Sequence, residues 1–260
     1  MNPDLELALE LVDAADVITL GHFRSVDLRV ETKPDNTPVS NADRETEEVI
    51  RERIGAARRG DAVVGEEFGS AGEGRRRWII DPVDGTRNYV RGIPVFATLL
   101  ALEEDGEVTV GVVSAPALGA RWWAARGEGA HGDQGPLQVS GVSLLEDATM
   151  CHASVESWRG EGRLEGFLEL SRRCGRDRGY GDFWQHMLVA QGSAEIAVEP
   201  SVSLWDMAAV KVIVEEAGGR FSDLSGRPDP AGGDAITSNG LLHEVALGHI
   251  GRLARDPRAG

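Results

Sequence analysis

Three short acidic segments lie where an apolar run of this 260-residue chain meets a turn or a helix. GEE at 65–67 follows the run AVV, DPVDGT at 81–86 follows WII, and WD at 205–206 opens the pattern MAAVKVIVEEA. Carboxylates in such positions can converge on metal ions, and hard cations such as Mg²⁺ prefer oxygen ligands. We therefore expect a fold that brings together three turns that lie far apart in the sequence.

The composition is that of an acidic globular protein, with 41% apolar residues and a formal net charge of −16. This charge leaves no basic surface for nucleic acid or an anionic membrane, so we expect neither as a partner. Cys151 and Cys174 lie far apart without a CxxC pair, which disfavours a disulfide framework and a thiolate zinc site. The first residues lack the pattern of a signal peptide, and a cytoplasmic location is expected.

The first half of the chain is predicted to combine two helices with a hairpin-rich sheet. Apolar residues recur at helical spacing over 3–21, and Ser40 or Asn41 begins a second helix that continues to about residue 54. Residues 31–39, between these helices, have the composition of a loop. Short apolar runs then predict strands at 62–65, 77–81, 95–103, 107–114 and 120–125.

After about residue 145, strands and helices alternate. The pattern predicts strands near 149–155, 194–198 and 235–237, and helices over 163–173, 182–191, 206–217 and 240–252. No low-complexity tract or linker separates the two halves of the sequence. We expect a layered α/β fold of the α+β kind, with subdomains over 1–142 and 143–260, the first carrying most of the candidate metal ligands.

Each acidic segment also has an ordinary structural explanation. Asp-Pro and Asp-Gly pairs commonly make turns, so 81–86 alone supports a function no better than a plain turn. The GEE segment could be a solvated turn, and Asp206 could be the N-cap of the helix that follows it. Asp43 could complete a capping arrangement with Ser40. No single segment decides between these interpretations.

Taken together, the segments resemble the inositol monophosphatase-like, Mg²⁺-dependent phosphatases over essentially the whole chain. Their signatures stand here as GEEFG at 65–69, WIIDPVDGTRNY at 78–89 and WDMAAVKVIVEEAGG at 205–219. The resemblance implies the αβαβα sandwich of the inositol monophosphatase and fructose-1,6-bisphosphatase fold, together with hydrolysis of a phosphate monoester. Val83 replaces the more usual Ile, which changes little because the family uses the backbone carbonyl of that residue.

Within this superfamily the chain is most similar to bacterial histidinol-phosphate phosphatases. Inositol-specific members typically have a second Thr at the position of Arg87, and a Gly-Thr-Ala-Ala-like stretch at 181–184. Both departures point away from inositol phosphate. The segments that carry the similarity are NYVRGIPVFATLLALEEDG at 88–106, GVVSAPALGARWWAARGEGA at 111–130, GYGDFW at 179–184 and SNGLLHE at 238–244.

The resemblance also implies roles for individual residues. Asp81 would bridge two Mg²⁺ ions that activate the attacking water and neutralise developing charge. Thr86 and Asp43 resemble the water-activating pair of the family, with Glu66 assisting, and Lys33 lies on the loop that closes over a third ion. A homodimer is expected by resemblance alone. The groups implied to bind the two to three ions are Glu66, Asp81, the Val83 carbonyl, Asp84 and Asp206.

Substrate choice is expected to come from the second half of the chain. Asp182 is the best indication, because L-histidinol carries an ammonium group and an imidazole that carboxylates bind through charge-assisted hydrogen bonds. Asp182 could instead be the N-cap of a helix that starts at Phe183. Glu199 aligns with a substrate-contacting Glu of the family but discriminates poorly between substrates. The residues expected to contact the substrate are Gly85, Thr86, Asp182, Glu199 and Asp206.

Aromatic and histidine residues give weaker indications. Trp122, Trp123 and Trp184 could line an imidazole pocket, although core packing is favoured for the first two. The six histidines lack ligand spacing, which disfavours a zinc or phosphohistidine mechanism.

Three hypotheses about function follow. The leading one is Mg²⁺-dependent hydrolysis of L-histidinol phosphate to L-histidinol and phosphate, a step of histidine biosynthesis. The enzymatic alternative is an inositol-1-phosphate or broad sugar-phosphate phosphatase of the same fold. A non-catalytic regulator is the alternative from another class, and the intact ligand set and acidic charge argue against it.

Overall fold

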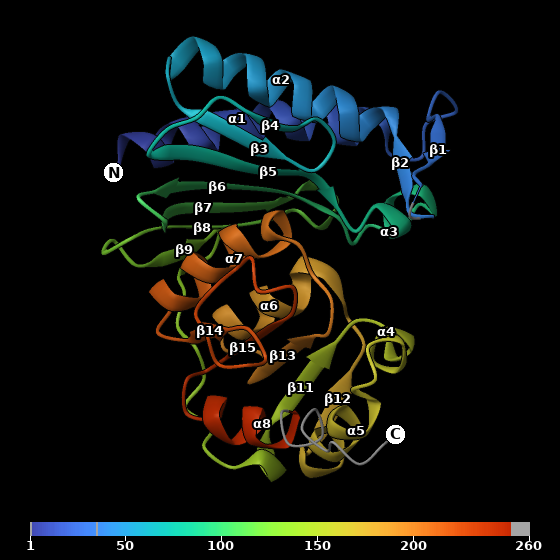
Figure 1. Cartoon of the computed structure of the whole chain (residues 1–260), viewed down its shortest axis with the longest axis vertical. Helices are drawn as coiled ribbons and strands as arrows, with labels where there is room; N and C mark the ends of the chain where they lie inside the picture. The colour runs from blue at the N-terminus through green and yellow to red at the C-terminus, as the bar shows by residue number, and fades with distance from the viewer. Residues whose placement is uncertain (1, 35, 251–260) are drawn as a thin grey trace.

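The computed structural model describes residues 2–34 and 36–250. The first of its two large sheets has eight strands, in the order β10-β9-β8-β7-β6-β5-β3-β4 (Figure 1). β3 and β5 are parallel and the other neighbours are antiparallel. The strands are β3 (Ala62–Gly65), β4 (Gly69–Ala71), β5 (Arg76–Asp84), β6 (Ala97–Glu104), β7 (Glu107–Ala115), β8 (Ala120–Ala125), β9 (Ala130–Gly132) and β10 (Gly135–Pro136).

A second sheet of five strands has the order β12-β11-β13-β15-β14. β11 runs parallel to β12 and β13, whereas β15 is antiparallel to β13 and β14. The strands are β11 (Thr149–His152), β12 (Arg176–Arg178), β13 (Ile196–Glu199), β14 (Arg220–Ser222) and β15 (Ala235–Ser238).

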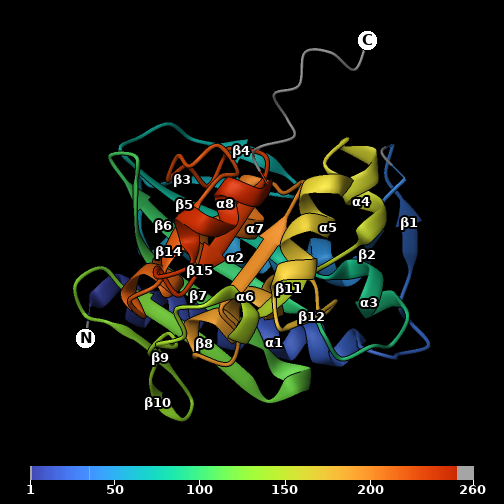
Figure 2. The same ribbon diagram turned by 90° about the horizontal axis from the view of Figure 1, so that it is seen from below.

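Helices alternate with the two sheets and complete five layers, which is the αβαβα arrangement expected from the sequence. α1 and α2 cover the outer face of the first sheet, and α6 and α7 lie between the sheets (Figure 1). Seen from below, α5 and α8 lie in front of the second sheet (Figure 2). None of the described helices has the length and apolarity needed to cross a membrane. The helices are α1 (Pro3–His22), α2 (Asn41–Ala57), α3 (Thr86–Val90), α4 (Val155–Gly160), α5 (Leu164–Arg173), α6 (Asp182–Ala190), α7 (Leu204–Glu216) and α8 (His243–Ile250), with short 3₁₀ turns at Pro116–Leu118 and Leu145–Asp147.

The central helix α7 is buried on all sides, because every residue from Met207 to Val214 is buried. An all-round apolar helix is stable only between two layers, and α7 packs on β5 to β8 of one sheet and on β14 and β15 of the other. Gly111 in β7 permits this contact. A Cβ at that position would lie 2.5 Å from Val212 Cγ1 and 2.7 Å from the Ala209 carbonyl. The close packing of α7 fixes the position of its first turn, which carries Asp206.

Most predicted elements are confirmed, and the differences have local causes. The expected loop over 31–39 contains a two-stranded hairpin of β1 (Val30–Thr32) and β2 (Pro38–Ser40). β1 is exposed and β2 has only three residues, so neither strand shows an apolar alternation. The strand predicted over 149–155 ends at His152, because α4 begins at Val155. The last helix spans 243–250, and its predicted end at 252 lies outside the described residues. Short strands such as β4 and β12 are fully exposed and were not predicted.

Candidate active site

The carboxyl end of β5 is bent so that its two aspartates reach one region. Asp81 pairs with Leu99 and Asp84 with Ala97, so two residues of β5 oppose one residue of β6 in a β-bulge. Thr98, opposite the bulge, donates a 2.8 Å hydrogen bond to the Pro82 carbonyl, and the Val83 amide donates to Asp81 Oδ1 at 3.0 Å. These contacts fix the bulge, which gives the two carboxylates directions that a regular strand would not give them.

Gly85 turns the chain from β5 into α3 with a left-handed φ of 80°. A Cβ there would meet the Val95 carbonyl at 2.9 Å, so both the backbone conformation and the space favour glycine. The turn places Thr86 beside the end of β5, where Thr86 Oγ1 donates to the Val83 carbonyl at 2.9 Å. The geometry of this turn therefore requires the glycine of the DPVDGT motif.

Asp206 joins the two aspartates of β5 from the opposite half of the chain. Ligand oxygens of Asp81, Asp84 and Asp206 all lie within 4.8 Å of one another. Asp206 is not the N-cap of α7. That position belongs to Ser203, whose amide donates to Asp206 Oδ2 at 2.7 Å in a capping box, so the helix starts two residues earlier than predicted. Asp206 can therefore serve both the helix start and a metal ion, because the capping box uses one carboxylate oxygen and leaves the other available.

A pocket of about 290 Å³, here named the aspartate pocket, surrounds this cluster. It contains all the metal ligands that the resemblance implies, and also Gly85 and Thr86. Its lining residues are Thr37, Pro38, Glu66, Asp81, Val83, Asp84, Gly85, Thr86, Arg87, Asp182, Ser203, Trp205 and Asp206.

The electrostatics of the cluster call for a cation. Burial and the negative charge of Glu66 raise the pKa of Asp81 well above its usual value, and burial with Asp182 and Asp206 does the same for Asp84. Burial also raises the pKa of Asp206 to about 7. Within the described part of the chain, no Lys or Arg forms an ion pair with these three aspartates. Crowded oxygen donors of this kind fit a hard divalent cation.

Glu66 reaches the aspartate pocket from the turn after β3. Glu47, a fully buried residue of α2, holds that turn by accepting hydrogen bonds from the amides of Glu67 at 2.8 Å and Phe68 at 3.2 Å. Lys33 donates to Glu66 Oε1 at 2.8 Å and to Glu67 Oε1 at 2.6 Å. The segment that carries Lys33 therefore closes on the GEE turn, and the turn is not a freely solvated one.

Asp43 both takes part in a capping box with Ser40 and lies beside Thr86, as the two interpretations of this residue expected. Its Oδ2 accepts hydrogen bonds from the Ser40 amide at 2.9 Å and the Ser40 hydroxyl at 2.5 Å, which completes a capping box at the start of α2. Its Oδ1 lies 3.3 Å from Thr86 Oγ1. Burial raises the pKa of Asp43, although the hydrogen bonds from Ser40 oppose the shift. Capping thus holds the carboxylate still while its second oxygen faces Thr86.

A second pocket of about 560 Å³, the adjoining pocket, shares Asp84, Arg87, Asp182 and Asp206 with the aspartate pocket. It is lined mainly by polar residues of the C-terminal half, and its two buried or nearly buried carboxylates outside the cluster belong to Asp182 and Glu199. The remaining lining residues are Ala153, Ser154, Glu156, Ser157, Phe183, Ser201, Val202 and Met207.

Asp182 is tied to the end of β5 and is not an N-cap. It lies inside α6, whose N-cap is Gly181, and its own φ of 50° is unusual for a residue other than glycine. Asn88 of α3 donates to Asp182 Oδ2 at 2.8 Å, and the Phe183 amide donates to Asp84 Oδ2 at 2.6 Å. These contacts join the two pockets. The alternative that Asp182 only caps a helix starting at Phe183 is therefore wrong.

Glu199 lies at the end of β13 and is only 7% exposed. Burial, with the charges of Asp182 and Asp206, raises the pKa of Glu199 well above its usual value, whereas a hydrogen bond from Gln185 opposes the rise. Trp122 and Trp184 line a different cavity of about 570 Å³, so neither contributes to the two pockets at the aspartates. Trp122 is buried against Phe183, as core packing predicted.

Several residues that shape the site were not singled out from the sequence. Asn88 stands inside the WIIDPVDGTRNY motif, so its position offered a signal, but nothing in the sequence shows that it contacts Asp182. Glu47 and Gln185 lie on helices and give no local signal. Their contacts arise from the packing of α2 against the GEE turn and of α6 against β13.

Comparison with known proteins now decides the family. The model of the inositol monophosphatase family matches residues 1–255. The chain belongs to the inositol monophosphatase family. Among curated members, a histidinol-phosphatase of Streptomyces coelicolor is 54% identical over 95% of this chain and 96% of its own length. A histidinol-phosphatase of Mycobacterium tuberculosis is 50% identical, over 95% of this chain and 97% of its own. An inositol-1-monophosphatase of Mesorhizobium japonicum is 34% identical over 85% of each chain.

Solved structures agree with this membership. The IMPase of Thermotoga maritima superposes with a TM-score of 0.87 at 31% identity, covering 97% of this chain and 98% of the other. An inositol monophosphatase of Zymomonas mobilis gives a TM-score of 0.86 at 30% identity, covering 95% and 97%. The layered α/β architecture is thus that of family members throughout its length.

Proposed function

We propose that this member of the inositol monophosphatase family is a histidinol-phosphatase, which hydrolyses L-histidinol phosphate to L-histidinol and phosphate. The observation that carries the proposal is the pair of connected pockets: a cluster of aspartates suited to a cation opens into a pocket with two further carboxylates. The sequence identity of at least 50% to two histidinol-phosphatases over nearly the full chain supports the proposal.

The aspartate pocket would hold two to three Mg²⁺ ions together with the phosphate group. The proposed ligands are Glu66, Asp81, the Val83 carbonyl, Asp84 and Asp206, all of which line this pocket. When bound, the ions supply Lewis-acid activation of water and neutralise charge on the phosphate oxygens. The Val83 carbonyl accepts a hydrogen bond from Thr86 Oγ1, and a carbonyl oxygen has a second lone pair that could serve this role. The amides of Gly85 and Thr86 would hold phosphate oxygens at the turn after β5.

Thr86 and Asp43 would orient the attacking water. Thr86 Oγ1 lies 2.9 Å from the Val83 carbonyl and 3.3 Å from Asp43 Oδ1. Its single proton would turn from the carbonyl to Asp43 when Thr86 Oγ1 accepts a hydrogen bond from that water. As the water attacks phosphorus, the bond between phosphorus and the ester oxygen would break. The proton of the attacking water would pass to Thr86 Oγ1 and the Thr86 proton to Asp43, while the released alcohol oxygen would take up a proton from solvent water. The buried carboxyl of Asp43 suits this role, because burial raises its pKa and so favours the protonated form.

The adjoining pocket would bind the alcohol part of the ester. L-histidinol carries an ammonium group and a titratable imidazole, and Asp182 and Glu199 offer carboxylate acceptors for such groups. An inositol leaving group is neutral and would leave both buried carboxylates without a charged partner, which disfavours it. The relatives of about 34% identity named as inositol-1-monophosphatases keep the broader phosphatase as the second candidate. A homodimer is proposed on family resemblance, and analytical ultracentrifugation tests it.

Phosphate release from L-histidinol phosphate and from myo-inositol 1-phosphate, each with Mg²⁺ and with chelator, tests the proposal. We expect kcat/KM to favour histidinol phosphate by about a hundredfold or more, which corresponds to about 2.7 kcal/mol of transition-state discrimination. Chelator should abolish both activities. Comparable rates on the two esters would instead support the broad phosphatase.

A further inference from the structure

Gln185 of α6 is a fully buried residue directly behind the adjoining pocket. Its Nε2 donates a hydrogen bond to Glu199 Oε1, and Glu199 lines the pocket. Gln185 itself does not line either pocket at the aspartates. It is therefore placed to act on a ligand only through Glu199.

The surroundings of Gln185 fix the direction of its amide. Nε2 lies 3.5 Å from His186 Nε2, and His186 Nδ1 lies 2.8 Å from Thr237 Oγ1. Burial lowers the pKa of His186 to about 3, so the ring is neutral and can carry its proton on Nδ1, toward Thr237. His186 Nε2 then faces Gln185 as an acceptor. The Glu199 carboxylate therefore selects the orientation in which the Gln185 amide nitrogen donates, and this tautomer of His186 adds a second acceptor on the same side.

This arrangement leaves the other end of the amide unsatisfied. Gln185 Oε1 is buried without a hydrogen-bond partner in the described structure. An unpaired buried acceptor lowers stability, and a Met or Leu of similar size would avoid that cost. A residue that served packing alone would gain nothing from the amide. The contact with Glu199 is the feature that the amide adds.

A carboxamide holds a carboxylate without neutralising it. Some buried carboxylates elsewhere in the fold are paired with guanidinium groups, as in Glu47 with Arg51 and Asp223 with Arg227, both at 2.7 Å. Glu199 has Gln185 instead, and Asp182 has Asn88 at 2.8 Å. The basic residue that lines the pocket, Arg87, is exposed to solvent; its charge opposes the rise in the pKa of Asp182, but within the described residues it forms no ion pair with Asp182 or Glu199. The pocket therefore keeps two oriented carboxylates available for a positively charged group.

We propose that Gln185 is a positioning residue that holds Glu199 as an acceptor facing the adjoining pocket, and that it thereby sets the preference for phosphate esters with a cationic leaving group. The inference rests on the proposed function, because it concerns the same pocket. It adds a residue outside the pocket wall, and it explains how a neutral side chain can control recognition of charge.

The test compares Gln185→Met with wild type on L-histidinol phosphate and on phenyl phosphate, whose leaving group is uncharged. We expect KM for histidinol phosphate to rise about tenfold with a smaller change in kcat, and little change in either constant for phenyl phosphate. Inhibition by the product L-histidinol should weaken by a similar factor. The melting temperature should change little, since removal of the unpaired Oε1 offsets the loss of the hydrogen bond to Glu199. Gln191→Met is the matched control, because Gln191 follows the same helix but lines the separate cavity with Trp122.

A double-mutant cycle with Glu199→Gln shows whether Gln185 acts through Glu199. The proposal expects Gln185→Met to have no further effect on histidinol phosphate once Glu199 has lost its charge. Equal losses on both esters, or a full additional loss in the Glu199→Gln background, would overturn it. The wild-type preference for histidinol phosphate over inositol phosphate is measured separately, so loss of the proposed function is not confused with loss of the role of Gln185.

Discussion

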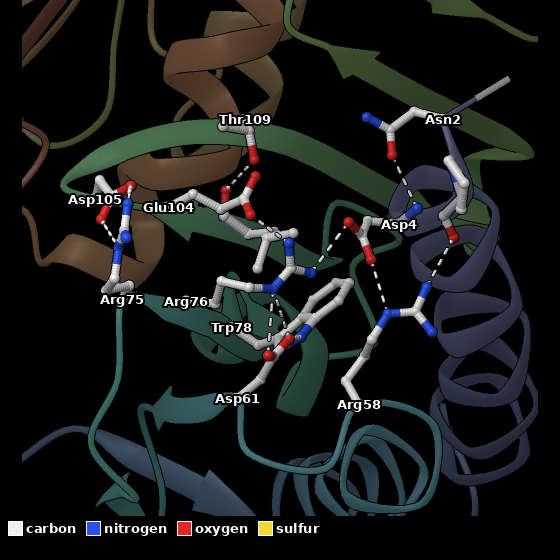
Figure 3. Close-up of polar contacts among 12 residues, drawn as sticks. Asn2, Asp4, Arg58, Asp61, Arg75, Arg76, Trp78, Glu104, Asp105 and Thr109 are labelled. Atoms are coloured by element: carbon white, nitrogen blue, oxygen red, sulfur yellow. Dashed lines mark hydrogen bonds and ion pairs between the residues drawn. The ribbon is translucent and has the colours of Figure 1, made fainter.

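The two ends of strand β5 differ in whether their carboxylates have basic partners. At its first residue, Arg76 forms ion pairs with Asp4 at 3.0 Å and Asp61 at 3.2 Å and a further one with Glu104, and Trp78 donates to Asp61 (Figure 3). At its last residues, Asp81 and Asp84 meet Asp206, and within the described structure none of these three forms an ion pair with a Lys or Arg. One strand thus begins in a balanced ion-pair network and ends in a concentration of negative charge.

The difference appears in the acidity of the carboxyl groups. Near Arg76, burial would raise the pKa of Asp4, but hydrogen bonds from Arg58 and Arg76 outweigh it and lower the value. At the other end, burial raises the pKa of Asp84, and Asp182 and Asp206 raise it further. The first end is satisfied by the chain itself, whereas the second is left for a cation from outside. Charge left uncompensated in a pocket therefore marks the functional end of the strand.

The largest effect is expected at the functional end. Asp84→Asn removes one ligand charge and should lower kcat/KM for histidinol phosphate roughly a thousandfold or more, because charge stabilisation in the transition state depends on the bound ions. Without metal, the variant should be at least as stable as wild type, since a repelling carboxylate is gone. Phosphate release and thermal melting in chelator check both parts.

Magnesium itself provides the control for Asp84→Asn. At about 100 times Kd, Mg²⁺ should add about 2.7 kcal/mol to the stability of wild type and less to the variant. Asp105→Asn, which removes an exposed partner of Arg75, should retain both activity and metal stabilisation. A fully active Asp84→Asn protein would contradict the assignment of this end of β5 and revive a non-catalytic role.

Glu47→Gln should produce the next largest effect, because Glu47 both forms a buried ion pair and supports a candidate metal ligand. It is paired with Arg51 at 2.7 Å, yet its oxygens also hold the turn that carries Glu66. We expect a loss of about 3 kcal/mol in unfolding free energy, and a 10- to 100-fold weaker apparent affinity for Mg²⁺ in activation assays. Glu169→Gln, which removes a solvent-exposed helix pair with Arg173, is the control and should change neither. Unchanged activation by Mg²⁺ would show that the GEE turn holds its position without Glu47.

Arg76→Met tests the balanced end of β5. Loss of the guanidinium leaves Asp4 and Asp61 without one of their partners, and the unfolding free energy should fall by about 2 kcal/mol, a value reduced for partial exposure. Neither kcat nor KM should change, because the substitution lies at the far end of the strand from Asp84. Urea denaturation and steady-state kinetics give the two numbers. A change in KM would show that the two ends are coupled through β5.

The sequence predicted much of the fold because its local signals agree with the tertiary structure. Ser40 or Asn41 was expected to begin α2, and Ser40 is its N-cap. Apolar runs located β3, β6, β7 and β8 within one or two residues. The DPVDGT motif located the turn after β5. The three-residue strands β1, β2 and β4 were missed because they form by pairing with a neighbouring strand and show no apolar alternation in the sequence.

The candidate site could be predicted in part for a similar reason. Asp81, Asp84 and Asp206 stand in motifs that local chemistry and resemblance both single out, and the structure brings their oxygens together. Asp182 was expected as a substrate contact or an N-cap, and only the fold shows that Asn88 holds it. Partners such as Asn88 and Gln185 act across 94 and 14 residues of sequence. No local pattern encodes contacts that depend on how layers pack.

The smallest of these effects is expected for Asp182→Asn, which tests whether charge at the functional end also serves the substrate. The variant keeps a side chain of the same size and lies outside the proposed ligand set. KM for histidinol phosphate should rise about tenfold, or about 1.4 kcal/mol, while phenyl phosphate changes much less. Steady-state kinetics with saturating Mg²⁺ separate the two substrates. If both esters lose the same factor, Asp182 serves Asp84 and the metals rather than the leaving group, and the negative charge at this end of β5 would have a single purpose.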